Sequence, residues 1–391
     1  MAQSLVIFLI RYKGETMVKV IRWICEKCDK KWIHPVEICL YCNGEIKKQV
    51  GSKTKVVGCT KVSIFNPLHP IVPYNVLILE DENGNKMPKK TIKDYNVGES
   101  YEDVPDSSEN VVSVVKIKYD FYEAVKEALE LIGGIEISAD KKILIKPNLS
   151  IPGHAYMGIC TNPKVLDALI QILIEKGAKK ENITIAEQSF FVPFEKAVAK
   201  SGVLDLLKKY GVNYIDISQT EFEEKKEREF TFEVSKIVNE FDLILNVPVI
   251  KTDMVLGIDG AFENITRFLS KKNFDELAKD LNKAAMALAV LSSILPKFIT
   301  IGDASIGMQG NGPAQYGEPG FYNLIFASRN SVVHDRAVQE VFCLRELPYI
   351  ELASQMGLGE YDLSKIKFIG NELDALRRDV KHPIGSKLIK K

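Results

Sequence analysis

The spacing of four cysteines near the N-terminus is the feature that most constrains the fold of this sequence. Cys25 and Cys28 form one Cys-x-x-Cys pair, and Cys39 and Cys42 form a second pair after ten intervening residues. Each pair directs two sulfur atoms toward one point, so two pairs complete a tetrahedron of thiolates around Zn²⁺. Because such a shell leaves no open position, the pattern predicts a structural zinc site in a ribbon over residues 18–50.

Other roles for these residues fit the pattern less well. A redox-active cysteine pair is the alternative, but two pairs at this spacing favour a metal site. His34 lies between the pairs and is expected to be a solvated or packing histidine, because four thiolates already fill the shell. We expect the remaining Cys59, Cys160 and Cys343 to behave as small buried hydrophobic residues.

Composition and charge exclude several classes of protein. Of the 391 residues, 46% are apolar and 27% charged, and the formal net charge is zero. These values indicate a globular protein without a global field that would attract nucleic acid or acidic membranes. A local basic excess in residues 1–61 is explained by a solvated face or by a modest basic patch.

The apolar segments predict neither a membrane span nor an export signal. No apolar run reaches the ~20 residues of a spanning helix. The run Leu5–Ile10 is short and lacks a preceding basic segment, so we expect a cytoplasmic protein with reduced thiols. Met17 offers a second possible start, and residues 1–16 carry no inference.

Residues 51–104 show the pattern of a small β domain. Strands are predicted at Thr54–Val62, Tyr74–Glu80 and Lys86–Ile92, with Asn83 and Gly84 as a hairpin turn between the last two. The polar run 104–110 contains few apolar residues and is predicted to be a linker.

From Val111 onward, strand-like apolar runs alternate with amphipathic helical segments, which predicts an α/β domain over residues 111–391. We expect a large doubly wound, mostly parallel sheet with helices on both faces. The predicted strands are Lys142–Lys146, Ile183–Ala186, Tyr214–Ile217, Leu243–Val247, Phe298–Ile301 and Leu324–Ala327. The predicted helices are Phe121–Ile132, Pro163–Lys176, Phe194–Tyr210, Asp275–Leu291, Ser331–Phe342 and Tyr349–Gln355.

Polar residues gather where these strands end. In doubly wound sheets, ligands bind beyond the carboxyl ends of the strands. Lysines, amides, a helix start and a glycine-rich loop suit an anion, and carboxylates there suit acid–base chemistry or a cation. The candidate catalytic residues are Lys146, Glu187, Lys251 and Asp303. The candidate substrate-binding residues are Asn148, Thr161, Asn162, Asn246, Asn264, Gly310, Asn311 and Gly312.

Each candidate also has a structural interpretation. Lys146 and Lys251 are explained equally well as long side chains that reach solvent from strand ends. Asn148 and Asn162 suit turns and helix caps, and the glycine-rich segment suits a plain turn. Asp335, which follows His334 at the head of a predicted helix, is expected to cap that helix or to compensate its dipole. Convergence on one edge of the sheet favours the functional interpretation.

The N-terminal segment resembles a known family. The stretch WICEKCDKKWIHPVEICLYC, Pro67–Pro73 and the closing Val97-Gly98-Glu99 resemble rubredoxin-like zinc ribbons fused to an OB-fold barrel, catalogued as domain of unknown function 35. The resemblance covers residues 20–104 and implies an OB barrel over 51–104. Members are associated with acyl-CoA enzymes, so it also implies a CoA thioester as ligand and a thiolase-like partner.

The larger segment resembles a second family. The motifs KPNL, TNPKVLDALI, LILNVPVIKT, GAFENI, GMQGNGP and VVHDRAVQ resemble the uncharacterised domain of unknown function 362, over residues 112–372. Two positions depart from its pattern. Asp253 stands where members often have histidine, and Glu263 stands where they often have lysine, which favours a charge-reversed or metal-assisted site over a lysine contact.

These observations support three hypotheses. The first is an enzyme or enzyme subunit that binds a small anionic or acyl substrate at the strand ends, with the N-terminal module docking acyl-CoA or a partner enzyme. The second is a non-catalytic scaffold for acyl-CoA enzymes. The third is nucleic-acid binding by the barrel, which its acidic residues disfavour.

Overall fold

The computed structural model describes residues 20–51, 53–64, 73–91, 94–101, 108–149, 151, 153–314, 316–345, 347–371 and 373–384. These residues form two compact units, one containing the described residues up to 101 and the other containing those from 108 onward. The predicted segment Pro67–Pro73 lies outside the described residues except for Pro73.

The small unit begins with a three-stranded antiparallel sheet. Strands β1 (Val20–Cys25), β2 (Lys31–Trp32) and β3 (Ile46–Gly51) lie in the order β2-β1-β3. Cys25 ends β1, so its sulfur lies where the chain turns toward β2. This arrangement of a short sheet and turns holds the four cysteines in place.

A second antiparallel sheet completes the small unit. Its strands β4 (Thr54–Val62), β5 (Tyr74–Glu80), β6 (Lys86–Thr91) and β7 (Ser100–Tyr101) lie in the order β6-β5-β4-β7. The three predicted strands and the turn at Gly84, where φ is +73°, are therefore confirmed. Val20 of the first sheet shares one apolar cluster with Val56, Leu77 and Leu79 of the second.

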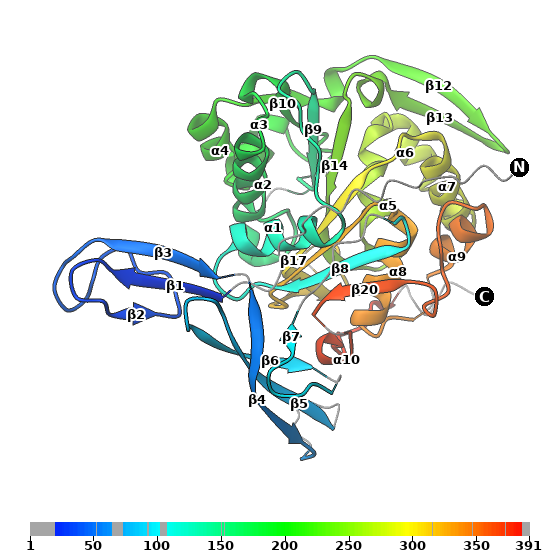
Figure 1. Ribbon diagram of the computed structural model, residues 1–391. Coiled ribbons are helices and arrows are strands. Elements are labelled where there is room, and N and C mark those ends of the chain that lie inside the picture. Colours follow the sequence, from blue (N-terminus) through cyan, green and yellow to red (C-terminus); the bar gives the residue numbers. More distant parts are fainter. Residues whose placement is uncertain are drawn as a thin grey trace, which may run out of the picture. The chain divides into compact units, whose positions relative to one another are not determined.

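The large unit is built on an eleven-stranded sheet, most of whose central strands are parallel (Figure 1). The main path runs β11-β10-β9-β14-β17-β19-β8-β20. Strands β15 and β18 also pair with β17, and β16 pairs with β15. The strands are β8 (Val111–Lys116), β9 (Ile143–Pro147), β10 (Ile183–Glu187), β11 (Asn213–Asp216), β14 (Leu243–Val247), β15 (Val249–Asp253), β16 (Gly257–Asp259), β17 (Ile299–Gly310), β18 (Gly317–Gly320), β19 (Leu324–Ser328) and β20 (Lys367–Gly370). A separate hairpin consists of β12 (Phe222–Glu227) and β13 (Phe230–Ser235).

Helices cover the sheet on both sides. In Figure 1, α1 and α2 lie on one side of the sheet, and α5, α7 and α8 lie on the other. The α-helices are α1 (Phe121–Leu131), α2 (Pro163–Glu175), α3 (Phe194–Lys200), α4 (Val203–Tyr210), α5 (Ala261–Asn264), α6 (Lys271–Leu277), α7 (Leu281–Ile294), α8 (Ser331–Val341), α9 (Pro348–Gln355) and α10 (Leu373–Leu376). Short 3₁₀ turns include η1 (Ala155–Met157) and η5 (Ile265–Phe268).

The predicted α/β architecture is confirmed in its main features. All six predicted strands form, and the five consecutive strands β11, β10, β9, β14 and β17 run parallel to one another. Strand β19 runs antiparallel to both β17 and β8, so the sheet is mixed. The helix predicted from Pro163 also forms, with the Asn162 side chain accepting the Lys164 N–H as its cap.

Two predicted helices are each split in two. The segment Phe194–Tyr210 forms α3 and α4, because Gly202 between them has a φ of +82° that ends regular helix. The segment Asp275–Leu291 is divided between α6 and α7. The N–H groups of Lys283 and Ala284 bond to the Asp280 carbonyl, so a new helix starts there.

The strand predicted at Phe298–Ile301 is much longer than expected. It continues as β17 to Gly310, because β15 and β18 pair with its second half. Gly302 and Gly307 belong to this strand and allow close contacts. A Cβ at Gly302 would lie 2.4 Å from His334 Nε2, and one at Gly307 would lie 2.1 Å from the Ile250 carbonyl oxygen. Asp303 therefore lies within a strand.

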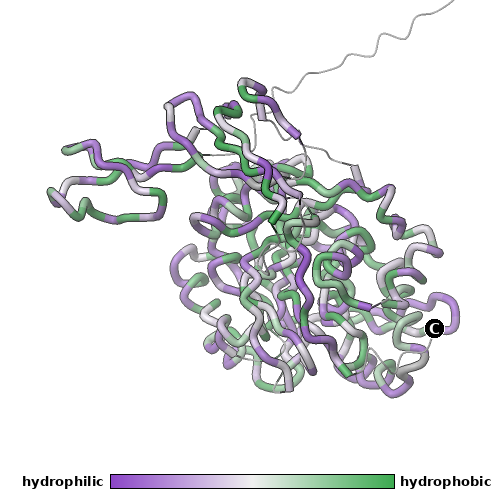
Figure 2. The backbone as a smooth tube through the Cα atoms, turned by 90° about the horizontal axis from the view of Figure 1, so that it is seen from below, coloured by the Kyte–Doolittle hydropathy of each residue, from purple (hydrophilic) through white to green (hydrophobic). Residues whose placement is uncertain are grey.

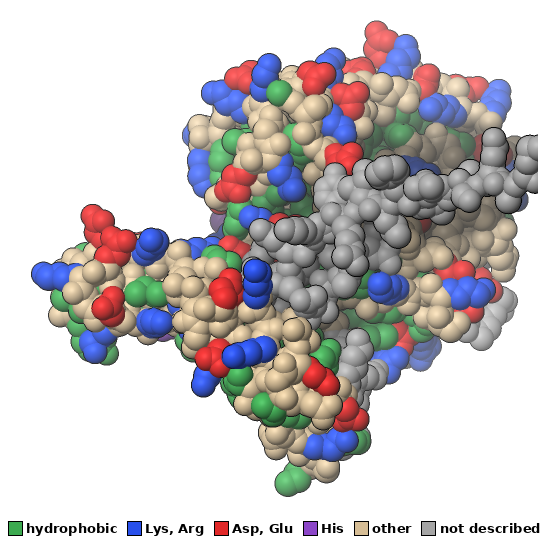
Figure 3. Space-filling model, in the orientation of Figure 1, with side chains coloured by type: hydrophobic (Ala, Val, Ile, Leu, Met, Phe, Trp, Pro, Cys, Tyr) green, Lys and Arg blue, Asp and Glu red, His purple; other side chains and the backbone are tan. Residues whose placement is uncertain are grey.

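The surface and the helices are consistent with the balanced composition. On the face shown in Figure 3, acidic and basic side chains are interspersed. Figure 2 shows polar and apolar residues alternating along the chain in both units. Among the described residues, no helix combines the length and apolar character needed to cross a bilayer.

The loop that carries η1 packs tightly against β17. Gly158 ends this turn with a φ of +68°, and a Cβ there would lie 1.9 Å from the Gly307 carbonyl oxygen. We expect Gly158→Ala to lower the free energy of unfolding by roughly 3 kcal/mol or more, from left-handed strain plus overpacking. The measurement is chemical denaturation of the whole chain.

Gly134→Ala is the matched control for this prediction. Gly134 has a φ of +72°, and nothing lies within 4 Å of its added Cβ. Gly134→Ala should lower the free energy of unfolding by about 1–2 kcal/mol, which is the backbone strain alone. Equal losses for the two variants would show that the contact with β17 is unimportant.

Candidate functional site

The four sulfur atoms of the small unit lie close together, as predicted. Cys25 Sγ lies 3.4 Å from Cys42 Sγ, and Cys28 Sγ lies 3.6 Å from Cys39 Sγ. All four lie within 4.8 Å of one another, and tetrahedral ligands around a metal–sulfur bond of 2.3 Å stand about 3.8 Å apart. Backbone N–H groups also point at Cys25 and Cys39 sulfurs, which stabilises thiolates. The cluster could therefore bind a metal ion.

In the large unit, Lys146 and Glu187 form a fully buried ion pair. Lys146 Nζ lies 2.9 Å from both carboxylate oxygens of Glu187 and also donates to the Pro147 carbonyl oxygen. Glu187 accepts two further backbone N–H groups, from Leu149 and Gln188. Burial lowers the pKa of Lys146, and Glu187 opposes that shift. The two residues thus satisfy each other and leave little capacity for a ligand.

Two of the predicted amides extend this pair into a network. Asn264 accepts a hydrogen bond from Lys146 Nζ at 3.2 Å and donates to Asn246 Oδ1 at 2.7 Å. Asn246 in turn donates to the Ala261 carbonyl oxygen. The network therefore joins the ends of β9, β10 and β14 to α5.

A second network contains Asp303 and the start of α2. The Asp303 carboxylate accepts the backbone N–H of Asn162 at 2.7 Å and the Ser305 hydroxyl at 2.6 Å. Thr161 accepts the Asn148 N–H and donates to the Val247 carbonyl oxygen. Burial raises the pKa of Asp303 to about 6. These four predicted residues hold a loop against the sheet.

The glycine-containing segment after β17 lies beside β15. A Cβ at Gly312 would lie 2.0 Å from the Thr252 carbonyl oxygen, and Thr252 donates to the Gly310 carbonyl oxygen. Asn311 Oδ1 accepts the N–H of Ile384. The segment therefore packs on protein groups, and its next residue, Pro313, reaches a cavity.

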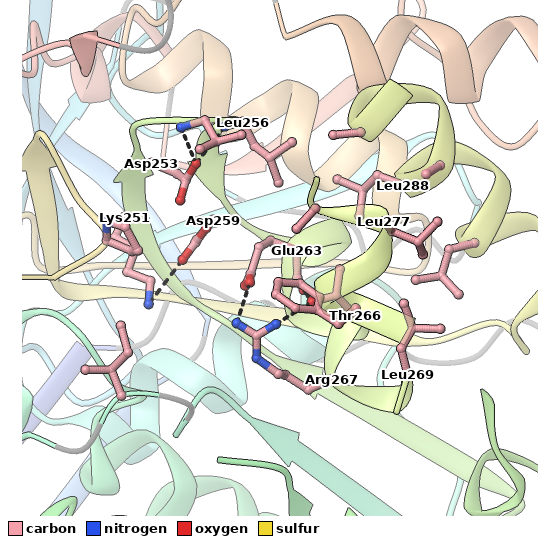
Figure 4. A pocket seen from close by; sticks show the side chains of 18 of the residues that line it. Lys251, Asp253, Leu256, Asp259, Glu263, Thr266, Arg267, Leu269, Leu277 and Leu288 are labelled. Carbon is pink, nitrogen blue, oxygen red and sulfur yellow. Dashed lines mark hydrogen bonds and ion pairs between the residues drawn. The ribbon is translucent and has the colours of Figure 1, made fainter. Parts of the chain in front are cut away.

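That cavity, of about 290 Å³, is the candidate functional site (Figure 4). One side is apolar and comes largely from α6 and α7, where Leu277 and Leu288 point inward. The opposite end is polar and comes from the β15–β16 hairpin, α5 and η5. Its charged side chains are Lys251, Asp253, Asp259, Glu263 and Arg267.

The hairpin places Lys251 opposite Asp259. The two residues are partners in the β15–β16 register, and Lys251 Nζ lies 3.1 Å from Asp259 Oδ2. Both side chains are at least nine-tenths buried, and Asp259 Oδ1 has no hydrogen-bond partner among the described residues. Burial, followed by the charge of Glu263, raises the pKa of Asp259 well above its usual range.

The remaining charges line the same end of the cavity. Glu263 pairs with Arg267 at 3.1 Å, and the guanidinium lies over two neighbouring rings, 4.4 Å from the centre of Phe190 and 4.6 Å from the centre of Phe274. Asp253 Oδ1 accepts the N–H groups of two residues in the hairpin turn, and burial raises its pKa.

A residue pair outside the cavity holds α5 in position. Asp335 accepts the N–H groups of Ala261 and Phe262, and its Oδ1 lies 2.8 Å from His334 Nδ1. The expectation that Asp335 caps its own helix is therefore wrong, since Asn330 caps α8 and Asp335 caps α5 instead.

Of the candidate catalytic residues, Lys251 alone lines the cavity. Asp259 and Arg267 were not predicted. Two sequence signals could have identified Asp259 and Arg267. One is the spacing of four residues between Glu263 and Arg267, and the other is the alternation of polar positions around the turn, at Lys251, Asp253, Gly257 and Asp259. The apolar wall carries no signal that distinguishes it from core.

Most of the large unit matches a known protein family. Residues 143–340 match the family described as Domain of unknown function (DUF362), which is just over half of the chain. The Thylakoid-associated protein sll1697 of Synechocystis sp. is 23% identical over 261 residues, covering 64% of this chain and 80% of that protein.

Two solved structures are similar over parts of the chain. The Ltp2-ChsH2(DUF35) aldolase is 15% identical, with a TM-score of 0.17, and the match covers 20% of this chain and 66% of that chain. The lactate racemase apoprotein from Thermoanaerobacterium thermosaccharolyticum is 17% identical, with a TM-score of 0.32 and 54% of each chain covered. The match thus spans about two thirds of the aldolase chain and about half of the racemase chain. Neither TM-score supports an inference about fold or function.

The buried Asp303 predicts a pH dependence of stability. Its folded pKa of about 6 lies above the ordinary value of 3.8, so the folded state keeps the proton longer than the unfolded state. Asp303 therefore stabilises the fold less as pH rises from about 4 to about 6, by on the order of 3 kcal/mol. The measurement is chemical denaturation of Asp303→Asn and of the unaltered chain at several pH values. As pH rises over this range, the free energy of unfolding of the unaltered chain should fall relative to that of Asp303→Asn.

Asp205→Asn, at an exposed position of α4, controls for the loss of one negative charge. A difference between Asp303→Asn and the unaltered chain that stays constant with pH would contradict the assignment.

Proposed function

The chain belongs to the DUF362 family, and we propose that it is an enzyme whose active site is the cavity between the β15–β16 hairpin and helices α6 and α7. The observation that carries the proposal is Asp259, whose buried Oδ1, at the polar end of an apolar cavity, has no hydrogen-bond partner in the part of the chain that the structure describes. Unpartnered buried carboxylate oxygens are costly, so such a group is retained where a ligand completes it.

Proton transfer is the chemistry that this arrangement favours. A buried carboxyl group with a raised pKa, next to an ammonium, is a stronger base than an ordinary carboxylate and is suited to proton transfer. Among the described residues, Lys251 uses two N–H donors on Asp259 and the Ile159 carbonyl oxygen. Its third donor can bond a substrate oxygen, and the apolar wall suits an aliphatic or acyl portion.

In the proposed step, Asp259 removes a proton from the substrate. The C–H bond next to a carbonyl or imine breaks, an O–H bond forms on Asp259, and the electron pair stays on the substrate beside Lys251. The proton then returns to carbon, so atoms and charge balance. Lys146 and Glu187 act as positioning residues that hold α5 and the strand ends.

Hydrogen exchange in heavy water tests the proposed active site. Small carbonyl and amino compounds with apolar chains are incubated with the protein, and deuterium on carbon is measured by mass spectrometry. We expect exchange that falls by roughly a hundredfold or more in Asp259→Asn, because general acid–base catalysis contributes factors of that size. If both Asp259→Asn and Lys251→Met exchange deuterium onto carbon as fast as the unaltered chain does, the proposal is wrong.

The matched control is Asp275→Asn. Asp275 lies on α6, which borders the cavity, but its side chain is half exposed and pairs with Lys271 outside the polar end. The substitution removes the same charge and should leave exchange unchanged.

For the small unit, we propose that the four cysteines hold one structural Zn²⁺. The spacing of the sulfurs and the N–H groups directed at them support this assignment. An acyl-CoA ligand, a thiolase-like partner and an OB barrel for the second small sheet rest on the sequence resemblance alone. A cytoplasmic location rests only on the sequence features of the apolar run at Leu5–Ile10.

Metal analysis of purified protein tests the zinc proposal. We expect about one zinc per chain, and loss of that zinc in Cys39→Ser, whose sulfur belongs to the cluster. Cys59→Ser, an exposed cysteine of β4, should retain it. Iron in place of zinc would overturn the choice of metal, and full zinc in Cys39→Ser would overturn the site.

A further inference from the structure

The polar end of the cavity contains more negative than positive charge. Three carboxylates, from Asp253, Asp259 and Glu263, face two cations, Lys251 and Arg267. Figure 4 shows these side chains directed into the same space. In a region with little water such an excess is unfavourable. Burial raises the pKa of Asp253 and of Asp259, so protonation relieves part of the excess, and a bound positive charge would relieve it further.

Both cations are already engaged. Lys251 lies 3.1 Å from Asp259, and Arg267 lies 3.1 Å from Glu263 while its guanidinium lies 4.4 Å from the centre of the Phe190 ring. No salt bridge joins a cation to Asp253 among the described residues, where backbone N–H groups alone stabilise one of its oxygens. An anionic head group would therefore meet paired cations and an unpaired carboxylate.

The nearby groups make the imbalance larger. Asp335, on α8, lies behind α5 and accepts two of its backbone N–H groups. Burial and the charge of Glu263 raise the pKa of Asp259 although Lys251 opposes that shift, so this one cation does not fully compensate the carboxyl group. Asp259 Oδ1 also needs a hydrogen-bond donor, which an ammonium group has and a carboxylate lacks.

We infer that the cavity binds an amphipathic amine, with the ammonium group between Asp253 and Asp259 and the apolar chain against α6 and α7. This inference rests on the proposed function and names one part of its substrate, an ammonium group carried in addition to the carbonyl or imine that the proposed step requires. It replaces the anionic ligand predicted from the lysines at the strand ends.

A preformed metal site accounts less well for these carboxylates. Within the described part of the chain, the four cysteines are the only group of three or more candidate ligands whose atoms gather closely enough for one ion. An ammonium ion needs fewer oxygens than Mg²⁺, which requires near-octahedral coordination.

Binding of three matched compounds to the intact chain tests the inference. Octylamine, octanol and octanoate share one apolar chain and differ in the charge of the head group. By calorimetry and thermal shift, we expect octylamine to bind at least tenfold more tightly than octanol, and octanoate to bind most weakly. This series needs no variant, so it does not depend on whether a substituted chain folds.

The variant Asp259→Asn tests whether the ammonium group contacts the Asp259 carboxylate. We expect it to weaken octylamine binding at least tenfold while octanol binding stays within twofold, because the alcohol carries no charge. Asp275→Asn again serves as the matched control and should leave both affinities unchanged.

Three results would overturn the inference. Tighter binding of octanol or octanoate would refute the amine but leave the proposed enzyme standing. Stabilisation by Mg²⁺ or Mn²⁺ alone that is lost in Asp259→Asn would replace the amine by a metal ion. Binding of none of the three compounds would count against both the amine and the cavity as an active site.

Discussion

The buried ion pair between Lys146 and Glu187 is the constraint on which the large unit depends. It joins the carboxyl ends of two neighbouring strands, β9 and β10, and through Asn264 it also fixes α5. Charges so completely removed from water are stable only when every donor and acceptor is satisfied. The strand ends, the loops and α5 must therefore keep one geometry, which provides a rigid base for the more open cavity beside it.

Much of the fold could be predicted because its signals are local. Buried parallel strands appear as short apolar runs, and capping residues such as Asn162 mark where a helix begins. The convergence of Lys146, Glu187 and Asn246 could also be predicted, because the carboxyl ends of parallel strands meet at one edge. Whether those groups face a ligand or one another depends on distances of a few ångströms, which no sequence pattern encodes.

The cavity could not be predicted, for a different reason. Its apolar wall is made of leucines such as Leu277 and Leu288, which look like ordinary core residues in an amphipathic helix. The role of individual glycines could not be predicted for a similar reason. The sequence cannot distinguish a glycine that permits a turn from one, such as Gly302 or Gly307, that permits another chain to approach a strand.

The β15–β16 hairpin fixes the distance between the two charged side chains on which the proposed chemistry depends. Because Lys251 and Asp259 face each other across paired strands, their separation is set by strand spacing and not by the length of the connecting turn. A change in the length of the turn would therefore leave the distance between the two charges unaltered, as long as the strand register is kept. New specificity can arise by exchanging the residues at positions 251 and 259 as a pair, with the rest of the scaffold unchanged.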